Sequence, residues 1–180
     1  MIVMKRQVPW LLAVLVTTVV FGTIYGVGQQ ILRMNANDPQ IQLAEDTASY
    51  INSGADPAKL ITGDVNLKAS LAPFIDIYNA EGQPIAGNGR LNGSLPAVPI
   101  GMLQASQGQA YSTVTWQPDT GVRIAAATAI SNTKTPYYVV AGRSLREVEK
   151  QENHVLVISA AGWLAALVIL GFSYYLVIVD

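Results

Sequence analysis

The sequence contains no cysteine and a single histidine, His154. Without cysteine the chain has no disulfide, no thiol nucleophile and no cysteine-based metal site, so packing alone must hold it together. One histidine without cysteine leaves no zinc-like ligand cluster, and the scattered Asp and Glu residues lack the spacing of a calcium-binding EF-hand. We therefore predict that the protein has no metal site and no cofactor.

Motifs of catalysis are also missing from the chain. There is no G-x-S-x-G, and a Ser-His-Asp arrangement could use only His154. Ser144 is better explained as a helix cap than as a nucleophile. The glycines around Asn88 lack the strand-to-helix context of a phosphate loop. We predict a protein that is not an enzyme and has no catalytic residues.

Charged residues are scarce, at 13 %, whereas 51 % of the residues are apolar. The excess lies in two runs without charge, residues 8–28 and residues 155–179. A bilayer core needs about 20 apolar helical residues, so both runs predict transmembrane helices. Two alternatives are a buried core helix and, for the first run, a cleavable signal peptide. The first run exceeds the usual apolar region of a signal peptide, about 7–15 residues.

The orientation of the chain follows from Lys5 and Arg6, because positive residues beside a span stay on the cytoplasmic side. We predict a cytoplasmic N-terminus (residues 1–7), a domain outside the cytoplasm (residues 29–154) and two spans in the cell membrane. That domain carries nine Lys or Arg and eleven Asp or Glu. It has no basic patch, which argues against nucleic acid as a partner and against a polybasic lipid switch. The two spans make the lipid bilayer the expected partner.

The outer domain begins with helical periodicity over residues 29–53, where apolar residues recur every three to four positions. Asn37-Asp38-Pro39 predicts a kink or a restart with Asp38 as N-cap, because proline suits the first position of a new helix. Gly54 should end the helix. Asp56-Pro57 predicts a second, short helix by the same logic.

The pattern then changes to a period of two, which is typical of strands. Turn residues at 79–83 and 118–121 separate the strands, and a short helix is expected over residues 99–109. We predict five strands, over residues 74–78, 84–86, 112–116, 122–130 and 137–142. The last is apolar on both sides and should lie in the centre of the sheet. The fold class is α+β, with an antiparallel sheet, helices on one of its faces and a long N-terminal helix. Ser144-Leu-Arg-Glu147 is a capping box that opens a helix running into the second span.

Two segments carry a resemblance to a known family. The first is Phe74-Ile-Asp-Ile-Tyr-Asn-Ala-Glu-Gly-Gln83 and the second is Tyr138-Val-Val-Ala-Gly-Arg-Ser-Leu145. With two spans, a long membrane-proximal helix and five strands, they resemble the PDC or Cache domains, which are the PAS-like extracytoplasmic sensors of bacterial sensor kinases and chemoreceptors. Those proteins continue into a HAMP, kinase or methyl-accepting region. This chain stops at Asp180, so we expect a sensor without its own output domain or a truncated receptor.

The resemblance implies a pocket for small carboxylates or amino acids on the sheet. Arg123 would be the anion anchor, because a guanidinium presents a fork of hydrogen-bond donors. Tyr111, Trp116 and Tyr138 would supply the walls. The alternatives are a solvent-facing Arg123 and aromatic residues that belong to the core.

Two functions follow from these features. The first is signal sensing, in which an unidentified ligand or signalling partner outside moves the helix that enters the second span. The alternative is an accessory or structural subunit that stabilises or regulates another membrane protein. Gly22 and Gly26 form G-x-x-x-G, which predicts a homodimer of packed spans, and ordinary membrane composition is the alternative explanation. His154 is expected at a surface or interface, with pH sensing as its alternative role.

Overall fold

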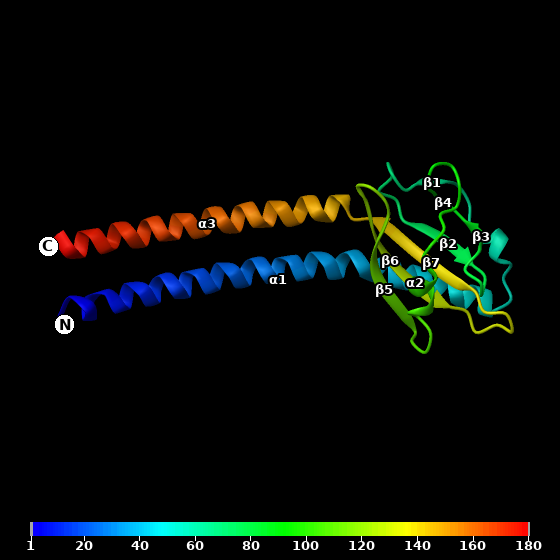
Figure 1. The fold of residues 1–180 in the computed structure, drawn as a ribbon, viewed down its shortest axis with the longest axis horizontal. Helices are drawn as coiled ribbons and strands as arrows, with labels where there is room; N and C mark the ends of the chain where they lie inside the picture. Colours follow the sequence, from blue (N-terminus) through cyan, green and yellow to red (C-terminus); the bar gives the residue numbers. More distant parts are fainter. Residues whose placement is uncertain (1, 180) are drawn as a thin grey trace. The chain divides into compact units, whose positions relative to one another are not determined.

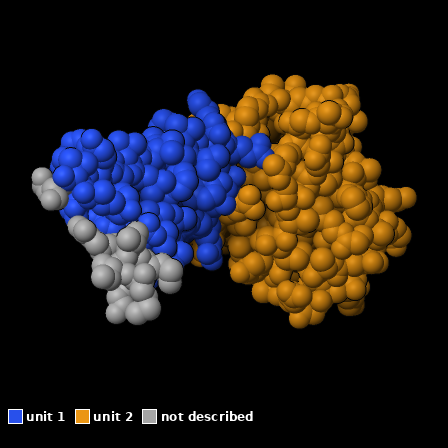
Figure 2. All heavy atoms as spheres, turned by 60° about the vertical axis from the view of Figure 1, so that its left-hand side comes forward, with its two compact units in different colours: residues 1–32, 149–180 blue, residues 33–148 orange. Residues whose placement is uncertain are grey.

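A computed structural model describes residues 2–179, with side chains from residue 7 onward. A very long helix leads into the sheet domain, and a second long helix leaves it (Figure 1). The chain divides into two compact units (Figure 2). Unit 1 combines Met1–Leu32 with Glu149–Asp180, and unit 2 is Arg33–Val148.

Helix α1 (Ile2–Asn52) continues past Pro39 without a break. The predicted restart at residues 37–39 is therefore wrong. Proline has the φ angle of a helix but removes one backbone hydrogen bond, at a cost of about 3 kcal/mol. Residues Ala44, Ala48 and Ile51 further along the helix are buried against the sheet, and this packing outweighs the lost bond. The helix ends just before Gly54, as predicted.

Unit 1 contains the first part of α1 and most of α3 (Arg146–Val179), a single helix of 34 residues. Both helices are long and apolar enough to cross a membrane, and the apolar window of each is 0 % buried. Large apolar side chains such as Leu15 and Val168 are exposed. An exposed apolar surface of this extent favours contact with lipid over the alternative of a buried core helix.

The two helices contact each other within unit 1. The indole Nε1 of Trp163 donates a hydrogen bond of 3.1 Å to Thr18 Oγ1. A Cβ added at Gly162 would lie 2.7 Å from the ring of Phe21, so glycine is what permits the close approach there. A Cβ at Gly22 or Gly26 would meet no heavy atom within 4 Å. Unlike Gly162, these two glycines are not required for a close approach of α1 and α3, and the homodimer stays a prediction.

Unit 2 is built on a five-stranded antiparallel sheet with the order β3-β2-β7-β6-β5. Its strands are β2 (Phe74–Tyr78), β3 (Pro84–Gly87), β5 (Tyr111–Asp119), β6 (Val122–Ile130) and β7 (Tyr138–Ser144). All five were predicted, with some shifts of the ends. Strand β7 lies in the centre, between β2 and β6, and its residues 138–142 are buried. This position agrees with its apolar residues on both sides. The α+β class and the antiparallel sheet are confirmed.

Both faces of the sheet are covered, which corrects the expectation of helices on one face. Ala44 and Ala48 of α1 pack on the face that presents Ile77, Ala127 and Val139. The opposite face carries Phe74, Trp116 and Ile124, and it packs against Met102 and Leu103 of the short helix α2 (Ile100–Gln104). Alanine side chains on the first face extend only a short way from the sheet, so a helix can approach its backbone closely.

Four small elements complete unit 2. A single 3-10 turn, η1 (Pro57–Lys59), replaces the predicted short helix, and Asp56 caps it by accepting a hydrogen bond of 3.0 Å from Ala58 N. Strands β1 (Val65–Asn66) and β4 (Gly89–Arg90) form a parallel pair that the sequence did not predict. Helix α2 is shorter than the predicted 99–109: turns follow it, and Gly108 has a positive φ of 75°.

Candidate functional site

The four predicted ligand residues lie in different environments. Arg123 is exposed on β6, between the buried Val122 and Ile124, as the alternation predicted. Trp116 is buried in the core on the α2 side of the sheet, whereas Tyr111 is exposed at the start of β5. Tyr138 is buried at the start of β7 and lines a pocket in unit 2 whose lining does not include the other three.

This pocket has a volume of about 420 Å³ and lies between two connections of the sheet. One wall is the segment of residues 106–110, which joins α2 to β5. The other wall comes from the β6–β7 hairpin and consists of Ile130, Asn132, Pro136 and Tyr138. The amide Nε2 of Gln107 donates a hydrogen bond of 2.7 Å to the hydroxyl of Tyr138, so a direct contact joins the two walls.

Local hydrogen bonds hold both walls in place. Ser106 is 0 % exposed and donates its hydroxyl to Leu103 O at 2.7 Å, which fixes the start of the first wall. In the hairpin, Tyr137 N donates to Ser131 Oγ at 2.8 Å, and Ser131 N donates to Tyr137 O at 2.9 Å. Asn132 N donates to Asn52 Oδ1 at 2.6 Å, which ties the hairpin to the end of α1. The pocket is therefore largely preformed.

The pocket lining is polar but uncharged. Its polar groups are the carboxamides of Gln107, Gln109 and Asn132 and the hydroxyl of Tyr138. Its apolar side chains are those of Ala110, Ile130 and Pro136. Among the described residues, no Lys, Arg, Asp, Glu or His lines the pocket. Removing an ion from water without an opposite charge or several hydrogen bonds is costly, so the lining favours a neutral occupant.

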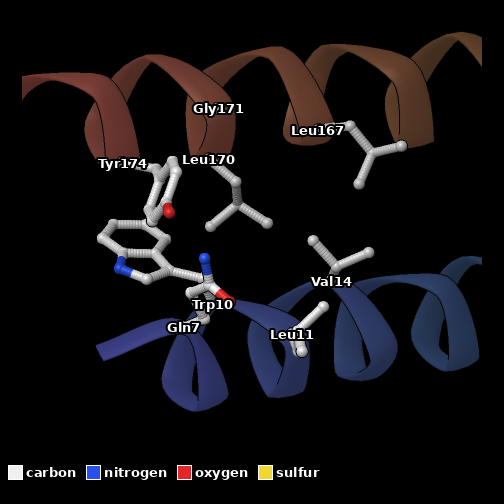
Figure 3. A pocket seen from close by; sticks show the side chains of 8 residues that line it. All are labelled: Gln7, Trp10, Leu11, Val14, Leu167, Leu170, Gly171 and Tyr174. Carbon is white, nitrogen blue, oxygen red and sulfur yellow. The ribbon is translucent and has the colours of Figure 1, made fainter. Parts of the chain in front are cut away.

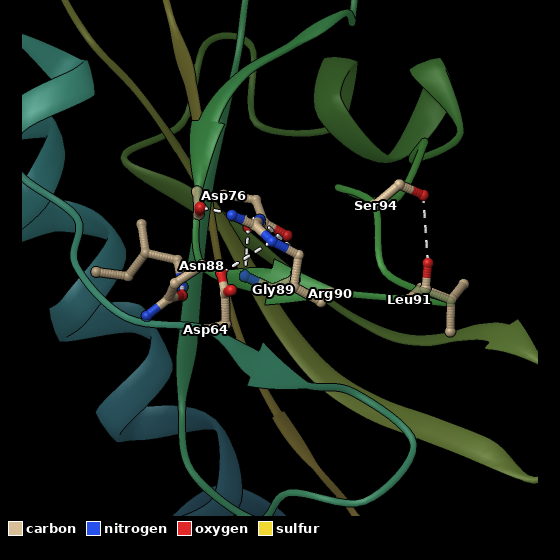
Figure 4. Close-up of polar contacts among 9 residues, drawn as sticks. Asp64, Asp76, Asn88, Gly89, Arg90, Leu91 and Ser94 are labelled. Atoms are coloured by element: carbon tan, nitrogen blue, oxygen red, sulfur yellow. Dashed lines mark hydrogen bonds and ion pairs between the residues drawn. The ribbon is translucent and has the colours of Figure 1, made fainter.

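A second feature is the buried carboxylate of Asp76 in β2 (Figure 4). Asp76 is 0 % exposed, and its Oδ1 accepts a hydrogen bond of 2.9 Å from Gly89 N. Its Oδ2 has no hydrogen-bond partner among the described residues. Burial raises the pKa of Asp76 to about 7, although the Gly89 amide and the Arg90 guanidinium act in the opposite direction.

The surroundings of Asp76 explain the sequence Gly87-Asn88-Gly89. A Cβ at Gly87 would lie 2.1 Å from Asp76 Oδ1, and one at Gly89 would lie 2.5 Å from Oδ2. Asn88 Oδ1 accepts a hydrogen bond of 2.8 Å from Ile75 N, so its side chain continues the pairing along β2. Arg90 Nε pairs with Asp64 Oδ1 at 2.9 Å. The two glycines are therefore needed for a close approach of the backbone to Asp76.

The junction of β7 with α3 is fixed by contacts to the loop before β2. Ser144 Oγ accepts a hydrogen bond of 3.3 Å from Arg146 N, so Ser144 caps the start of α3, while the reciprocal Glu147 bond of the predicted capping box stays a prediction. Arg143 Nε donates to Leu71 O at 3.0 Å rather than pairing with Glu147. Arg146 Nη2 donates to the carbonyl oxygen of Lys68, whose ammonium pairs with Asp119 at 2.6 Å.

Unit 1 has an apolar groove of about 440 Å³ (Figure 3). Trp10 and Tyr174 stand at one end with ring centroids 5.3 Å apart in an edge-to-face arrangement, and Leu11, Val14 and Leu170 continue the wall. Within the described residues, no group of three or more His, Asp or Glu side chains could hold a metal ion. Comparisons of the chain with protein-family models, with curated proteins and with solved structures give no match.

Proposed function

We propose that the chain is a membrane-anchored sensing module of the Cache or PAS-like kind. Unit 2 lies outside the cytoplasm, binds a small molecule or a partner, and passes the signal through α3. The protein carries out no reaction of its own in this proposal. Support comes from the order of elements, in which a long helix enters an antiparallel sheet and the central strand leads directly into a helix that can span a membrane.

One observation carries the proposal, and it concerns strand β7. Its first residue, Tyr138, lines the pocket, and its last residue, Ser144, caps α3. A strand paired on both sides is stiff, so a displacement at Tyr138 reaches Ser144 within seven residues. Helix α3 is then continuous for 34 residues, or about 50 Å, and contains no proline.

The second candidate is an accessory subunit that holds another membrane protein. The apolar groove of unit 1, with Trp10, Val14 and Leu170 in its wall, favours this function because a helix of a partner could fill it. Such a subunit needs no coupling between the pocket and α3. The two functions therefore differ in what occupation of the pocket does to α3.

We expect that filling the pocket changes how strongly the backbone amides at the start of α3 are protected from hydrogen exchange. Ala110 is exposed in the pocket wall, and Ala110→Trp places a large side chain there. A change of about 1 kcal/mol in local stability alters amide exchange about fivefold. Hydrogen exchange of the full-length protein in nanodiscs should show this change over residues 144–150.

The matched control is Val114→Trp, which adds the same side chain to an exposed position of β5. It should leave the exchange of residues 144–150 as in the wild type. Equal exchange in both variants and in the wild type would rule out coupling and favour the accessory subunit.

The topology is the next prediction. Lys59 is 84 % exposed in unit 2, so Lys59→Cys presents a thiol in a chain that has none. We expect an impermeant maleimide to label this cysteine in intact bacterial cells, and to label a cysteine appended after Asp180 only once the membrane is opened. The reverse labelling pattern would place unit 2 in the cytoplasm.

A further inference from the structure

The side chains in the pocket of unit 2 can both donate and accept hydrogen bonds. Gln107, Gln109 and Asn132 each carry a carboxamide, which has an NH₂ donor and a carbonyl acceptor. Gln107 uses one N–H on Tyr138, whose hydroxyl keeps its own proton to donate. A ligand with donors and acceptors of its own can therefore be bound on several sides.

The same lining disfavours ions. A carboxylate or ammonium ligand would lose its hydration, and the described lining residues offer no opposite charge in return. Arg123 does not line this pocket, so an anion site at Arg123, as predicted from the sequence, would be separate from it. The pocket thus selects by hydrogen bonding, a mode that rejects molecules lacking the matching groups.

The geometry also suits a small molecule. The volume of about 420 Å³ falls within the range of about 300–1,000 Å³ that is typical of ligand pockets. The walls are fixed by Ser106, by the Ser131–Tyr137 pair and by the Asn132–Asn52 bond, so little order must be gained on binding. Ala110, Ile130 and Pro136 supply apolar contact beside the polar groups.

We infer that this pocket binds an uncharged small molecule that carries several hydrogen-bonding groups, such as a polyol or a carboxamide. This inference rests on the proposed sensing function and names the class of its ligand. Gln107 and Tyr138 bind the polar groups of the ligand. Because Tyr138 begins β7, the ligand acts directly on the strand that leads to α3.

The test uses the full-length protein in nanodiscs and a library of several hundred fragments. Half of the fragments are uncharged, and the other half are anions and cations of matched size. Binding is detected on the fragments by saturation-transfer NMR at millimolar concentration. We expect uncharged fragments with donors and acceptors to bind, with charged ones of the same size absent from the hits.

Three variants locate the binding. Ala110→Trp should abolish it by filling the pocket, and Tyr138→Phe should weaken it about three- to tenfold by removing one hydroxyl. Tyr50→Phe is the matched control, because it removes a hydroxyl from an exposed tyrosine of α1 that does not line the pocket, and it should leave binding unchanged. Circular dichroism of each variant checks that it folds. Tyr138→Phe keeps the test valid if Ala110→Trp does not fold, since it preserves the ring in the core.

Three results would overturn the inference. They are no uncharged hit, a hit list of mainly charged fragments, or hits that bind Tyr138→Phe as tightly as the wild type. The sensing function fails separately. If fragments bind but hydrogen exchange over residues 144–150 stays constant, the ligand class stands and the transmission through α3 does not. If hydrogen exchange over residues 144–150 responds to Ala110→Trp but no uncharged fragment binds, the transmission through α3 stands and the ligand class does not.

Discussion

Replacing Asp76 with asparagine is expected to remove a loss of stability that the wild-type protein shows as the pH rises from about 4 to about 7. The Asp76 carboxyl has a pKa of about 7 in the folded chain and 3.8 as its ordinary value. Between these values the folded chain holds a proton that the unfolded chain has released. Stability is therefore highest below pH 3.8 and is lost as the pH rises through about 7.

The size of the effect follows from the same two pKa values. Each unit of difference corresponds to about 1.4 kcal/mol, so the contribution of Asp76 changes by on the order of 4 kcal/mol across this window. Two groups face the carboxyl from neighbouring positions. Arg90 favours the charged form, whereas Tyr78 stays neutral because burial and, second, the Asp76 carboxylate raise its pKa. Asparagine keeps the acceptor for Gly89 N and carries no charge at any pH.

Urea unfolding of the full-length protein in detergent, followed by near-ultraviolet circular dichroism from pH 4 to pH 8, measures this difference. The matched control is Asp46→Asn, which removes an exposed carboxylate from α1. The Asp76→Asn variant should be the more stable protein at pH 8 and should show a flatter pH profile than the wild type. Parallel profiles for Asp76→Asn and wild type would mean that Asp76 is ionised in the folded chain throughout the window.

Local sequence patterns were sufficient for the two long helices and the five strands of the main sheet, but not for the small elements η1, β1 and β4. The runs at 8–28 and 155–179 predicted helices because an uncharged stretch of that length cannot leave its backbone unpaired in lipid. The central position of β7 followed from residues that are apolar on both sides. Ser144 was recognisable as a cap because Ser144-Leu-Arg-Glu147 matches the S-x-x-E pattern of a capping box.

The coverage of the sheet could not be predicted in the same way. Residues 122–130 read as one apolar face, with Val122 and Ile124, and one face that carries Arg123 and small alanines. Ala127 and Ala129 on the second face are nevertheless buried, because α1 packs on them. Alanine is too small to mark a buried face by hydropathy, although its size is what lets the helix approach. Propensity likewise failed at Pro39, where tertiary packing determined the outcome.

The candidate site was predicted only at Tyr138. The carboxamides of Gln107, Gln109 and Asn132 come from connections that are distant in the sequence, and the fold brings them together. No spacing rule applies to such a pocket. The Asp76 site did leave a signal, since an acidic residue inside Phe-Ile-Asp-Ile-Tyr is unusual for a buried strand, and Gly-Asn-Gly follows at residues 87–89. Their proximity depends on the β2–β3 hairpin and its bulge.

The second large effect is expected from Gly142→Ala in the central strand. Gly142 pairs with Phe74 of β2, and the ring of Phe74 lies over the glycine. A Cβ at this position would lie 2.5 Å from Phe74 Cζ and 2.9 Å from Ile124 Cγ2. Phe74 is 1 % exposed and Ile124 is also buried, so neither side chain has space to withdraw. Adding a methyl group to such a core costs about 1–3 kcal/mol.

Gly101→Ala provides the matched comparison for this substitution. Gly101 lies in α2, and a Cβ there would meet nothing within 4 Å. Alanine is favoured over glycine inside a helix by about 1 kcal/mol, so this variant should be as stable as the wild type or slightly more stable. The double variant Gly142→Ala with Phe74→Leu should lose less stability than the two single changes added together, because the smaller side chain relieves the contact. Thermal unfolding of the wild type, the three single variants and the double variant measures these differences. Equal stability of Gly142→Ala and Gly101→Ala would show that β2 and β7 can separate enough to admit the methyl group, and that β7 is not held as rigidly as transmission from Tyr138 to Ser144 requires.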